Sequence, residues 1–219
     1  QETIHLNNGD QIGRIVLGSC EWAAKDSTTK VLSRPTKPLE ELDYNSAYGL
    51  YIKGKYQADT RYYVEAEASI SKSLKVDPAL IPALAEMAML QYRKMNYESA
   101  FEYARKALSM DSYNGMANYY YGLSALKLDK VYDAEDGFEV ATVTDDYRAA
   151  ALTELSKVKI RQKKFDEALS YASKSLVYNS ENITALQLQY LSARLLQNKA
   201  LEKTISEKIL MIDPFNHFI

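Results

Sequence analysis

The residues that could do acid–base, nucleophilic or metal chemistry are few in this sequence and lie far apart. The two histidines, His5 and His217, stand near opposite ends, and neither has a companion at metal-ligand spacing. The single cysteine, Cys20, has no neighbour that would activate its thiol and no second cysteine to pair with. Asp145-Asp146 is an acidic pair more typical of a helix start than of a metal site. No phosphate loop or nucleophile elbow occurs. We therefore predict a protein that is not an enzyme and has no metal or cofactor.

Charge and hydropathy argue against two further classes of partner. The 219 residues carry a formal net charge of −2, and the span 46–219 is balanced. A general nucleic-acid or membrane-surface binder would need a basic excess. No apolar run approaches the roughly 20 residues that cross a bilayer. We expect no nucleic-acid partner and no membrane insertion. No targeting segment is visible, which leaves cytoplasmic and periplasmic locations open.

The elements that must position any functional side chain repeat with a constant period of about 34 residues. Turn positions mark the end of each repeat: Pro78, Ser112, Asp146, Ser180 and Pro214. They close five units, which span residues 47–80, 81–114, 115–148, 149–182 and 183–216. Each unit holds two apolar-periodic segments separated by a short polar break, so the sequence predicts two helices per unit. An aromatic or apolar residue is predicted to begin the second helix: Tyr63, Tyr97, Val131 and Phe165.

Small side chains recur at three positions where helices must approach closely. The eighth residues of the units are Gly54, Ala88, Gly122, Ser156 and Tyr190. The twentieth residues are Ala66, Ala100, Ala134, Ala168 and Glu202. The twenty-seventh residues are Ser73, Ala107, Ala141, Ser175 and Ile209. We predict that the first two positions lie where the helices of one unit cross, and that the third faces the first helix of the next unit.

These residues resemble tetratricopeptide repeats over the span 47–216. The resemblance implies an all-α solenoid, a right-handed superhelix of helix pairs, that works as a non-catalytic interaction module. The units 81–114, 115–148 and 149–182 fit the family pattern closely. The first unit departs from it at Lys53 and Gln57. The fifth departs at Tyr190, Glu202 and Ile209, which leaves the packing of the last helix pair open.

Residues 1–45 have a different pattern. Two β-branched runs, 3–6 and 12–17, flank the segment 7–10, which contains Asn8-Gly9 and predicts a β-hairpin. An extended passage between Pro35 and Pro38 follows. It is interpreted as a stiff connector, with a P-x-x-P ligand for an aromatic groove as the alternative. We therefore expect an N-terminal hairpin and linker segment over 1–45, and the five units with a short apolar tail over 46–219.

Both ends are compatible with a piece of a longer protein. A β-like lead-in followed by this array is similar to the repeat region of large multidomain bacterial proteins, which carry an upstream β-rich domain. That weaker resemblance implies an alternative function: an intramolecular scaffold that positions an adjacent β-rich domain, which could be enzymatic or carbohydrate-related. At the other end, Ile205, Ile209 and Ile212 are followed by Phe215 and Phe218. The tail either folds back over this apolar face, or a further segment or second copy covers it. We predict self-association through this end.

The resemblance places the binding groove on the first helices of the units. The groove residues that it implies are Tyr51, Lys55, Met89, Tyr92, Arg93, Tyr119, Leu123, Lys127, Lys157, Arg161 and Arg194. Among them Arg93, Lys127 and Arg161 occupy the same position in three successive units and predict a basic ladder beside tyrosines. This pattern favours a peptide or protein segment of acidic and apolar character. The alternative is that each cation only stabilises a helix C-terminus.

One class of partner is disfavoured. Family members that hold the C-terminal carboxylate of chaperones use a set of Lys, Asn and Arg side chains on three successive units. The matching positions here include Glu86 and Glu154, which would repel a carboxylate. We therefore do not expect chaperone tails as ligands.

Overall fold

The computed structural model describes residues 14–17, 20–23 and 43–219. The chain divides into two units, residues 1–42 and Asp43–Ile219. In the first unit, β1 (Arg14–Leu17) pairs antiparallel with β2 (Cys20–Ala23), with Ile15 opposite Trp22. This pairing was not predicted, and the predicted pairing of the run 12–17 with 3–6 involves residues outside the described ones. The predicted turn at Asn8-Gly9 and the passage between Pro35 and Pro38 lie outside the described residues.

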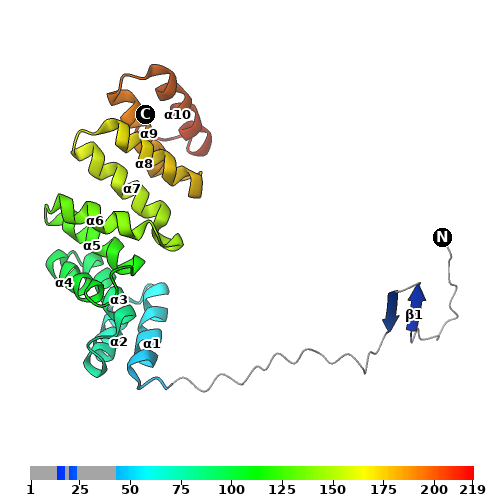
Figure 1. The fold of residues 1–219 in the computed structure, drawn as a ribbon, viewed down its shortest axis with the longest axis vertical. Helices are drawn as coiled ribbons and strands as arrows, with labels where there is room; N and C mark the ends of the chain where they lie inside the picture. The colour runs from blue at the N-terminus through cyan, green and yellow to red at the C-terminus, as the bar shows by residue number, and fades with distance from the viewer. Residues whose placement is uncertain (1–13, 18–19, 24–42) are drawn as a thin grey trace. The chain divides into compact units, whose positions relative to one another are not determined.

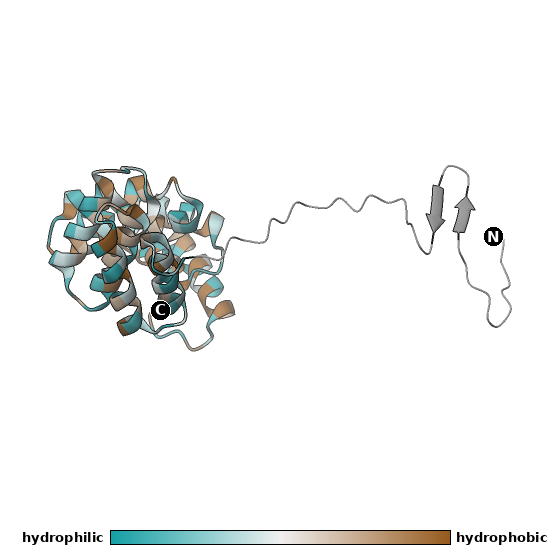
Figure 2. Ribbon diagram, turned by 90° about the horizontal axis from the view of Figure 1, so that it is seen from below, coloured by the Kyte–Doolittle hydropathy of each residue, from teal (hydrophilic) through white to brown (hydrophobic). Residues whose placement is uncertain are grey.

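The second unit is built from α-helices that follow one another in chain order along the stack (Figure 1). They are α1 (Ala47–Asp59), α2 (Tyr63–Val76), α3 (Ile81–Arg93), α4 (Tyr97–Leu108), α5 (Gly115–Lys127), α6 (Val131–Ala141), α7 (Asp145–Arg161), α8 (Phe165–Tyr178), α9 (Ile183–Leu195) and α10 (Lys199–Ile212). Hydrophobic and hydrophilic segments alternate along them (Figure 2), as expected of helices that each bury one side. The predicted all-α solenoid of helix pairs is confirmed.

The turn inside every unit has the same conformation. One residue of each turn has a positive φ between 59° and 68°, and these residues occupy the same position in successive units: Arg61, Met95, Asp129, Lys163 and Gln197. A left-handed residue just after a helix lets its N–H satisfy a carbonyl of the last turn. The second helix then begins at the predicted residue in the first four units: Tyr63, Tyr97, Val131 and Phe165.

The small residues lie where the helices approach most closely. Ala66, Ala100 and Ala107 are fully buried. A Cβ added to Gly54 would lie 2.6 Å from the Ile70 side chain, and one added to Gly122 would lie 2.7 Å from the Phe138 ring. The fifth unit is an exception to this pattern but still folds. The Tyr190 side chain is almost fully buried at the crossing of α9 and α10, together with Ile205 and Ile209.

One helix begins earlier than its unit. The helices α1, α3, α5 and α9 start at the first residue of their units, whereas α7 starts at Asp145, before position 149. Thr144 occupies the cap position, and Asp145 and Asp146 lie in the first turn. Acidic side chains are stabilised there by the helix dipole. Arg148 donates from Nε to the Thr142 carbonyl at 2.8 Å, which satisfies the end of α6. The acidic pair therefore marks a helix start, as the sequence indicates.

The C-terminal residues pack back onto the last helix pair. The Phe218 ring lies 6.3 Å from that of Tyr190, and Gln187 donates from Nε2 to Oδ1 of Asn216 at 3.3 Å. Ile219 packs against the buried cluster of α9 and α10. Of the two arrangements that the sequence left open, the tail folds back. Met211 and Phe215 nevertheless remain exposed, and self-association stays a prediction. Among the described residues, no helix has the length and apolar character needed to cross a membrane.

Candidate binding site

The face formed by the first helices of the units, here called the first-helix face, carries a cavity of about 230 Å³. Its walls come from the first helices α1, α3, α5 and α7 and from the start of α2. They are Lys55, Ala58, Asp59, Tyr63, Glu86, Met89, Arg93, Met116, Tyr120 and Tyr147. Residues from successive units therefore converge on one small hollow, which only the stacking of the units can produce.

A buried acid is part of this wall. Glu86 on α3 is only 2% exposed. Within the described part of the chain, no hydrogen bond or ion pair reaches its carboxylate. Burial raises the pKa of Glu86 above its usual value, with the nearby Lys55 opposing the rise and Asp59 adding to it. A carboxylate in such surroundings is costly to ionise unless a cation joins it.

The two basic side chains of the cavity wall are already engaged. Lys55 pairs with Asp59, one turn later on α1, at 3.1 Å. The Arg93 guanidinium lies 4.1 Å from the centre of the Tyr63 ring, a cation–π contact. Neither cation is paired with Glu86.

A row of tyrosines borders the cavity and crosses from α3 over α5 to α7. The Tyr92 and Tyr120 ring centres are 6.0 Å apart, those of Tyr120 and Tyr119 are 5.5 Å apart, and those of Tyr119 and Tyr147 are 5.3 Å apart. Burial raises the pKa of Tyr120 to about 12 and also raises those of Tyr119 and Tyr147. These phenols are therefore neutral at physiological pH and offer rings and hydroxyl donors to a ligand.

The basic side chains of the predicted ladder have partners within the chain. Arg93 stacks on Tyr63, and the Lys127 ammonium lies 5.9 Å from the centre of the Tyr97 ring. In the next unit Val131 replaces the tyrosine, and Arg161 pairs instead with Asp129 at 2.9 Å. The last turns of α3, α5 and α7 thus contact the turn, or the start of the second helix, of the preceding unit. These contacts give the ladder a role in joining units, and its preference for an acidic segment stays an untested prediction.

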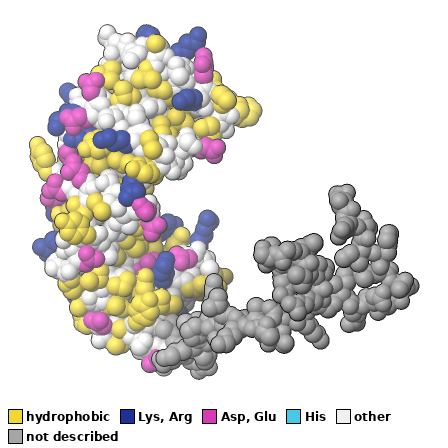
Figure 3. All heavy atoms as spheres, turned by 45° about the vertical axis from the view of Figure 1, so that its right-hand side comes forward, with side chains coloured by type: hydrophobic (Ala, Val, Ile, Leu, Met, Phe, Trp, Pro, Cys, Tyr) yellow, Lys and Arg dark blue, Asp and Glu magenta, His cyan; other side chains and the backbone are white. Residues whose placement is uncertain are grey.

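Charge is mixed on the face of the array that Figure 3 draws. Basic and acidic side chains lie next to one another over the face drawn in Figure 3, and neither sign dominates a large area of it. Such a face offers no long-range attraction for a uniformly charged partner.

The remaining predicted residues lie in several different settings. Lys157 pairs with Glu154 on its own helix at 2.6 Å. Leu123 is half-buried and packs against the core cluster around Phe138. Tyr51 lies on α1 with its ring 5.8 Å from that of Tyr48. Arg194 is exposed on α9 and is not part of the cavity. Of the predicted groove residues, the cavity brings together Lys55, Met89 and Arg93, with Tyr92 and Tyr119 in the adjoining row.

The predicted groove residues do not include the other residues that line the cavity, and two of these, Glu86 and Tyr147, matter most for the site. Glu86 entered the sequence analysis only as an obstacle to carboxylate binding, because its burial depends on helices from other units. Tyr147 was absent, because the repeat register assigns it to a turn. The signal for Tyr147 was present: the run Thr144-Asp145-Asp146 has the composition of a capped helix start.

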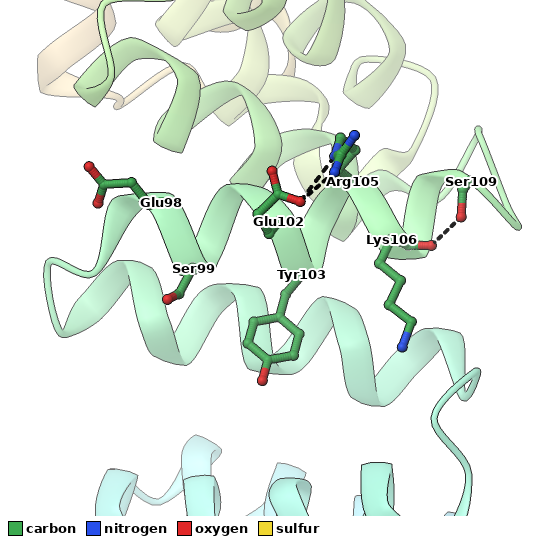
Figure 4. Close-up of a pocket in the computed structure, with 7 residues that line it drawn as sticks. All are labelled: Glu98, Ser99, Glu102, Tyr103, Arg105, Lys106 and Ser109. Carbon is green, nitrogen blue, oxygen red and sulfur yellow. Dashed lines mark hydrogen bonds and ion pairs between the residues drawn. The ribbon is translucent and has the colours of Figure 1, made fainter.

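A wider hollow of about 660 Å³ lies elsewhere and is a weak candidate site. All the residues that line it lie on α4 or directly after it (Figure 4). Glu102 and Arg105 pair with each other, and Ser109 donates to the Lys106 carbonyl. One helix cannot enclose a ligand, so this hollow is an open surface. Among the described residues, no group of three or more His, Cys, Asp or Glu side chains could hold a metal ion.

Comparison with known proteins identifies the fold. No family model matches the sequence, and no curated protein matches it. Solved structures match well. MamA is 20% identical, with a TM-score of 0.66 over 74% of this chain and 94% of MamA. YrrB, described as a TPR protein with an unusual peptide-binding site, is 18% identical, with a TM-score of 0.66 over 80% of this chain and 91% of YrrB. PilF of Pseudomonas aeruginosa is 21% identical, with a TM-score of 0.69 over 78% of each chain. The array formed by residues 43–219 therefore has the tetratricopeptide-repeat fold.

Proposed function

We propose that this chain is a non-catalytic interaction module whose first-helix face binds an extended or helical segment of a partner protein. The row of tyrosines from Tyr92 to Tyr147 beside the cavity is the observation that carries the proposal. Tyrosine is enriched at binding hot spots because it offers a rigid ring and a polar tip. The peptide-binding site printed for YrrB, a protein of the same fold, supports the same reading.

Selection from a random peptide library against the full chain tests this proposal. Selected peptides are expected to lose about 10-fold to 100-fold in affinity on Tyr147→Ala, as for a hot-spot residue. Tyr132→Ala is the matched control, because Tyr132 is exposed on the second helix α6 and lies outside the cavity. Thermal melts of both variants check that the array stays folded.

The outcome also separates the two functions considered from the sequence. Peptides that bind equally well to both tyrosine variants would contradict the first-helix face as the binding site. If the library yields no peptide that binds the chain, the scaffold alternative is favoured, in which the array only positions a neighbouring domain.

A further inference from the structure

Glu86 is a buried acid without a partner at the wall of a cavity. The side chain is 2% exposed, and no described residue pairs with it. Removing an unpaired carboxylate from most of its contact with water is costly, so folded proteins rarely keep one without a role for it. A purely structural carboxylate would be expected to have a donor within the chain.

The same position two units later shows what such a donor looks like. Glu154 occupies on the first helix α7 the place that Glu86 occupies on α3. Lys157, one turn further along α7, pairs with it at 2.6 Å. The residue at the corresponding place in the second unit is Met89, which lines the cavity and has no charge. The helix of Glu154 therefore supplies a lysine for its acid and the helix of Glu86 does not, while the nearby Lys55 on α1 pairs with Asp59.

The other walls suit a cation. Three tyrosines and two methionines line the cavity: Tyr63, Tyr120, Tyr147, Met89 and Met116. Aromatic faces attract cations, most strongly where water is excluded. The aliphatic stem of a long basic side chain could lie along the methionines while its charged end reaches the acid.

We propose that this cavity takes a basic side chain, lysine or arginine, from the protein segment that the first-helix face binds, with Glu86 as its counter-ion. The inference rests on the proposed function and adds the chemistry of the ligand. The bound cation takes the place beside Glu86 that Lys157 takes beside Glu154. At this position the partner side chain is basic, whereas the basic ladder predicts an acidic partner.

Binding is expected to weaken in acid. Burial raises the pKa of Glu86 above its usual 4.5, and a bound cation favours the ionised form. The affinity therefore falls as the pH falls through the pKa of Glu86. The other charged or titratable groups at the cavity are Lys55 and Asp59 on α1, Tyr63 on α2, Arg93 on α3, Tyr120 on α5 and Tyr147 on α7. Of these only Asp59 is a carboxylate, and it pairs with Lys55.

Methyl NMR of the methionines gives a direct readout. The chain has six methionines, and of these Met89 and Met116 line the cavity. The full chain with labelled methionine methyls is titrated with capped glycine-rich peptides that carry one central lysine, arginine, glutamate or norleucine. We expect the lysine and arginine peptides to shift the Met89 and Met116 signals saturably, and the glutamate and norleucine peptides to leave them in place.

Two variants and one control test the role of Glu86. Glu86→Gln removes the counter-ion, and Met89→Lys supplies an internal cation of the kind that Lys157 provides. Both variants are expected to lower the affinity for the lysine peptide at least 10-fold. In Met89→Lys, binding is followed by the Met116 methyl signal. Glu154→Gln is the matched control and should bind as the unmodified chain does. Glu86→Gln should also keep or raise the thermal stability at neutral pH, because it removes a buried charge.

The results separate this inference from the proposed function. If the norleucine peptide shifts Met89 and Met116 as much as the lysine peptide, or if Glu86→Gln leaves the lysine affinity unchanged, the cation site is wrong while the first-helix face still binds segments. If no basic peptide shifts either methionine at millimolar concentration, the cation site is also wrong. The library selection with Tyr147→Ala then decides the proposed function independently.

Discussion

Contacts between successive units alternate between two kinds. Glu67 in the first unit accepts hydrogen bonds from Gln91 Nε2 at 2.8 Å and Lys94 Nζ at 3.0 Å in the second. At the corresponding place between the second and third units, Phe101 instead stacks on Tyr121, with ring centres 4.5 Å apart. Between the third and fourth units the polar contact returns: Glu135 accepts from Lys159 Nζ at 2.5 Å and Gln162 Nε2 at 2.7 Å. Over the first four units the array therefore has a structural period of two units.

The two polar contacts share their geometry but exchange their donors. Glutamine precedes lysine in the first contact, and lysine precedes glutamine in the second, at the same two positions of their units. The exchange moves the cation inward, since Lys94 is half exposed whereas Lys159 is only 5% exposed. Glu167, at 2.7 Å, gives the buried lysine a second carboxylate, and the matching residue in the second unit is Ser99. A buried cation is tolerated only where enough acceptors surround it.

The helix crossings inside the first four units follow the same two-unit period. Gly54 meets Ile70 in the first unit, and Gly122 meets Phe138 in the third. The corresponding pairs in the second and fourth units are Ala88 with Ala104 and Ser156 with Ala172, all fully buried. A bulky residue on the second helix is thus paired with glycine on the first, because the two side chains at a close-packed crossing must together fill the same space.

The largest effect is expected from the apolar contact. Phe101→Ala removes a ring that is 6% exposed and packs on Tyr121, so the free energy of unfolding should fall by about 3–5 kcal/mol. Chemical denaturation followed by circular dichroism measures it. Repeat arrays unfold as one transition only while the contacts between neighbouring units hold. Loss of this contact should therefore also lower the dependence of the unfolding free energy on denaturant concentration. A loss below about 1 kcal/mol, the range of surface changes, would contradict the importance of this contact.

A smaller effect is expected from the inner polar contact. Glu135→Ala leaves Lys159 buried with Glu167 alone, and the loss should be about 1.5–3 kcal/mol. Burial opposes the charge of Glu135, but hydrogen bonds from Lys159 and Gln162 outweigh it and lower its pKa below 4.5. The stabilisation is therefore full above pH 4.5 and is lost as the pH falls through the lowered pKa. Denaturation midpoints across this range should converge for Glu135→Ala and the unmodified chain. Asp136→Ala, an exposed neighbour on α6, serves as the control.

The smallest effect is expected from the outer polar contact. Lys94 and Glu67 are 51% and 27% exposed, so water and salt screen their attraction. A double-mutant cycle with Glu67→Ala and Lys94→Ala should give a coupling of about 0.2–1 kcal/mol that shrinks at high salt. If the coupling free energy of Glu67 and Lys94 were as large as the stability lost in Glu135→Ala, the different burial of the two lysines would not explain the strength of the two contacts.

The sequence by itself determined the fold and much of its internal packing. The repeat register predicts the helix pairs, the second-helix starts from Tyr63 to Phe165, and the close crossings at Gly54, Ala88 and Gly122. These features depend on residue type at fixed local spacing, which the sequence displays directly. The pairing of β1 with β2 was not predicted, because the Asn-Gly signal pointed to a different turn.

Only the tertiary structure decided which of the groove side chains are available to a ligand and which are engaged by other residues of the chain. Arg93 stacks on Tyr63 and Arg161 pairs with Asp129, because the last turns of the first helices α3 and α7 pack against the preceding unit. The early start of α7 brings Tyr147 to a cavity shared with α1 and α3. The same stacking buries Glu86 without a partner among the described residues. Whether a charge is available to a ligand depends on contacts between units, and local spacing does not specify those contacts.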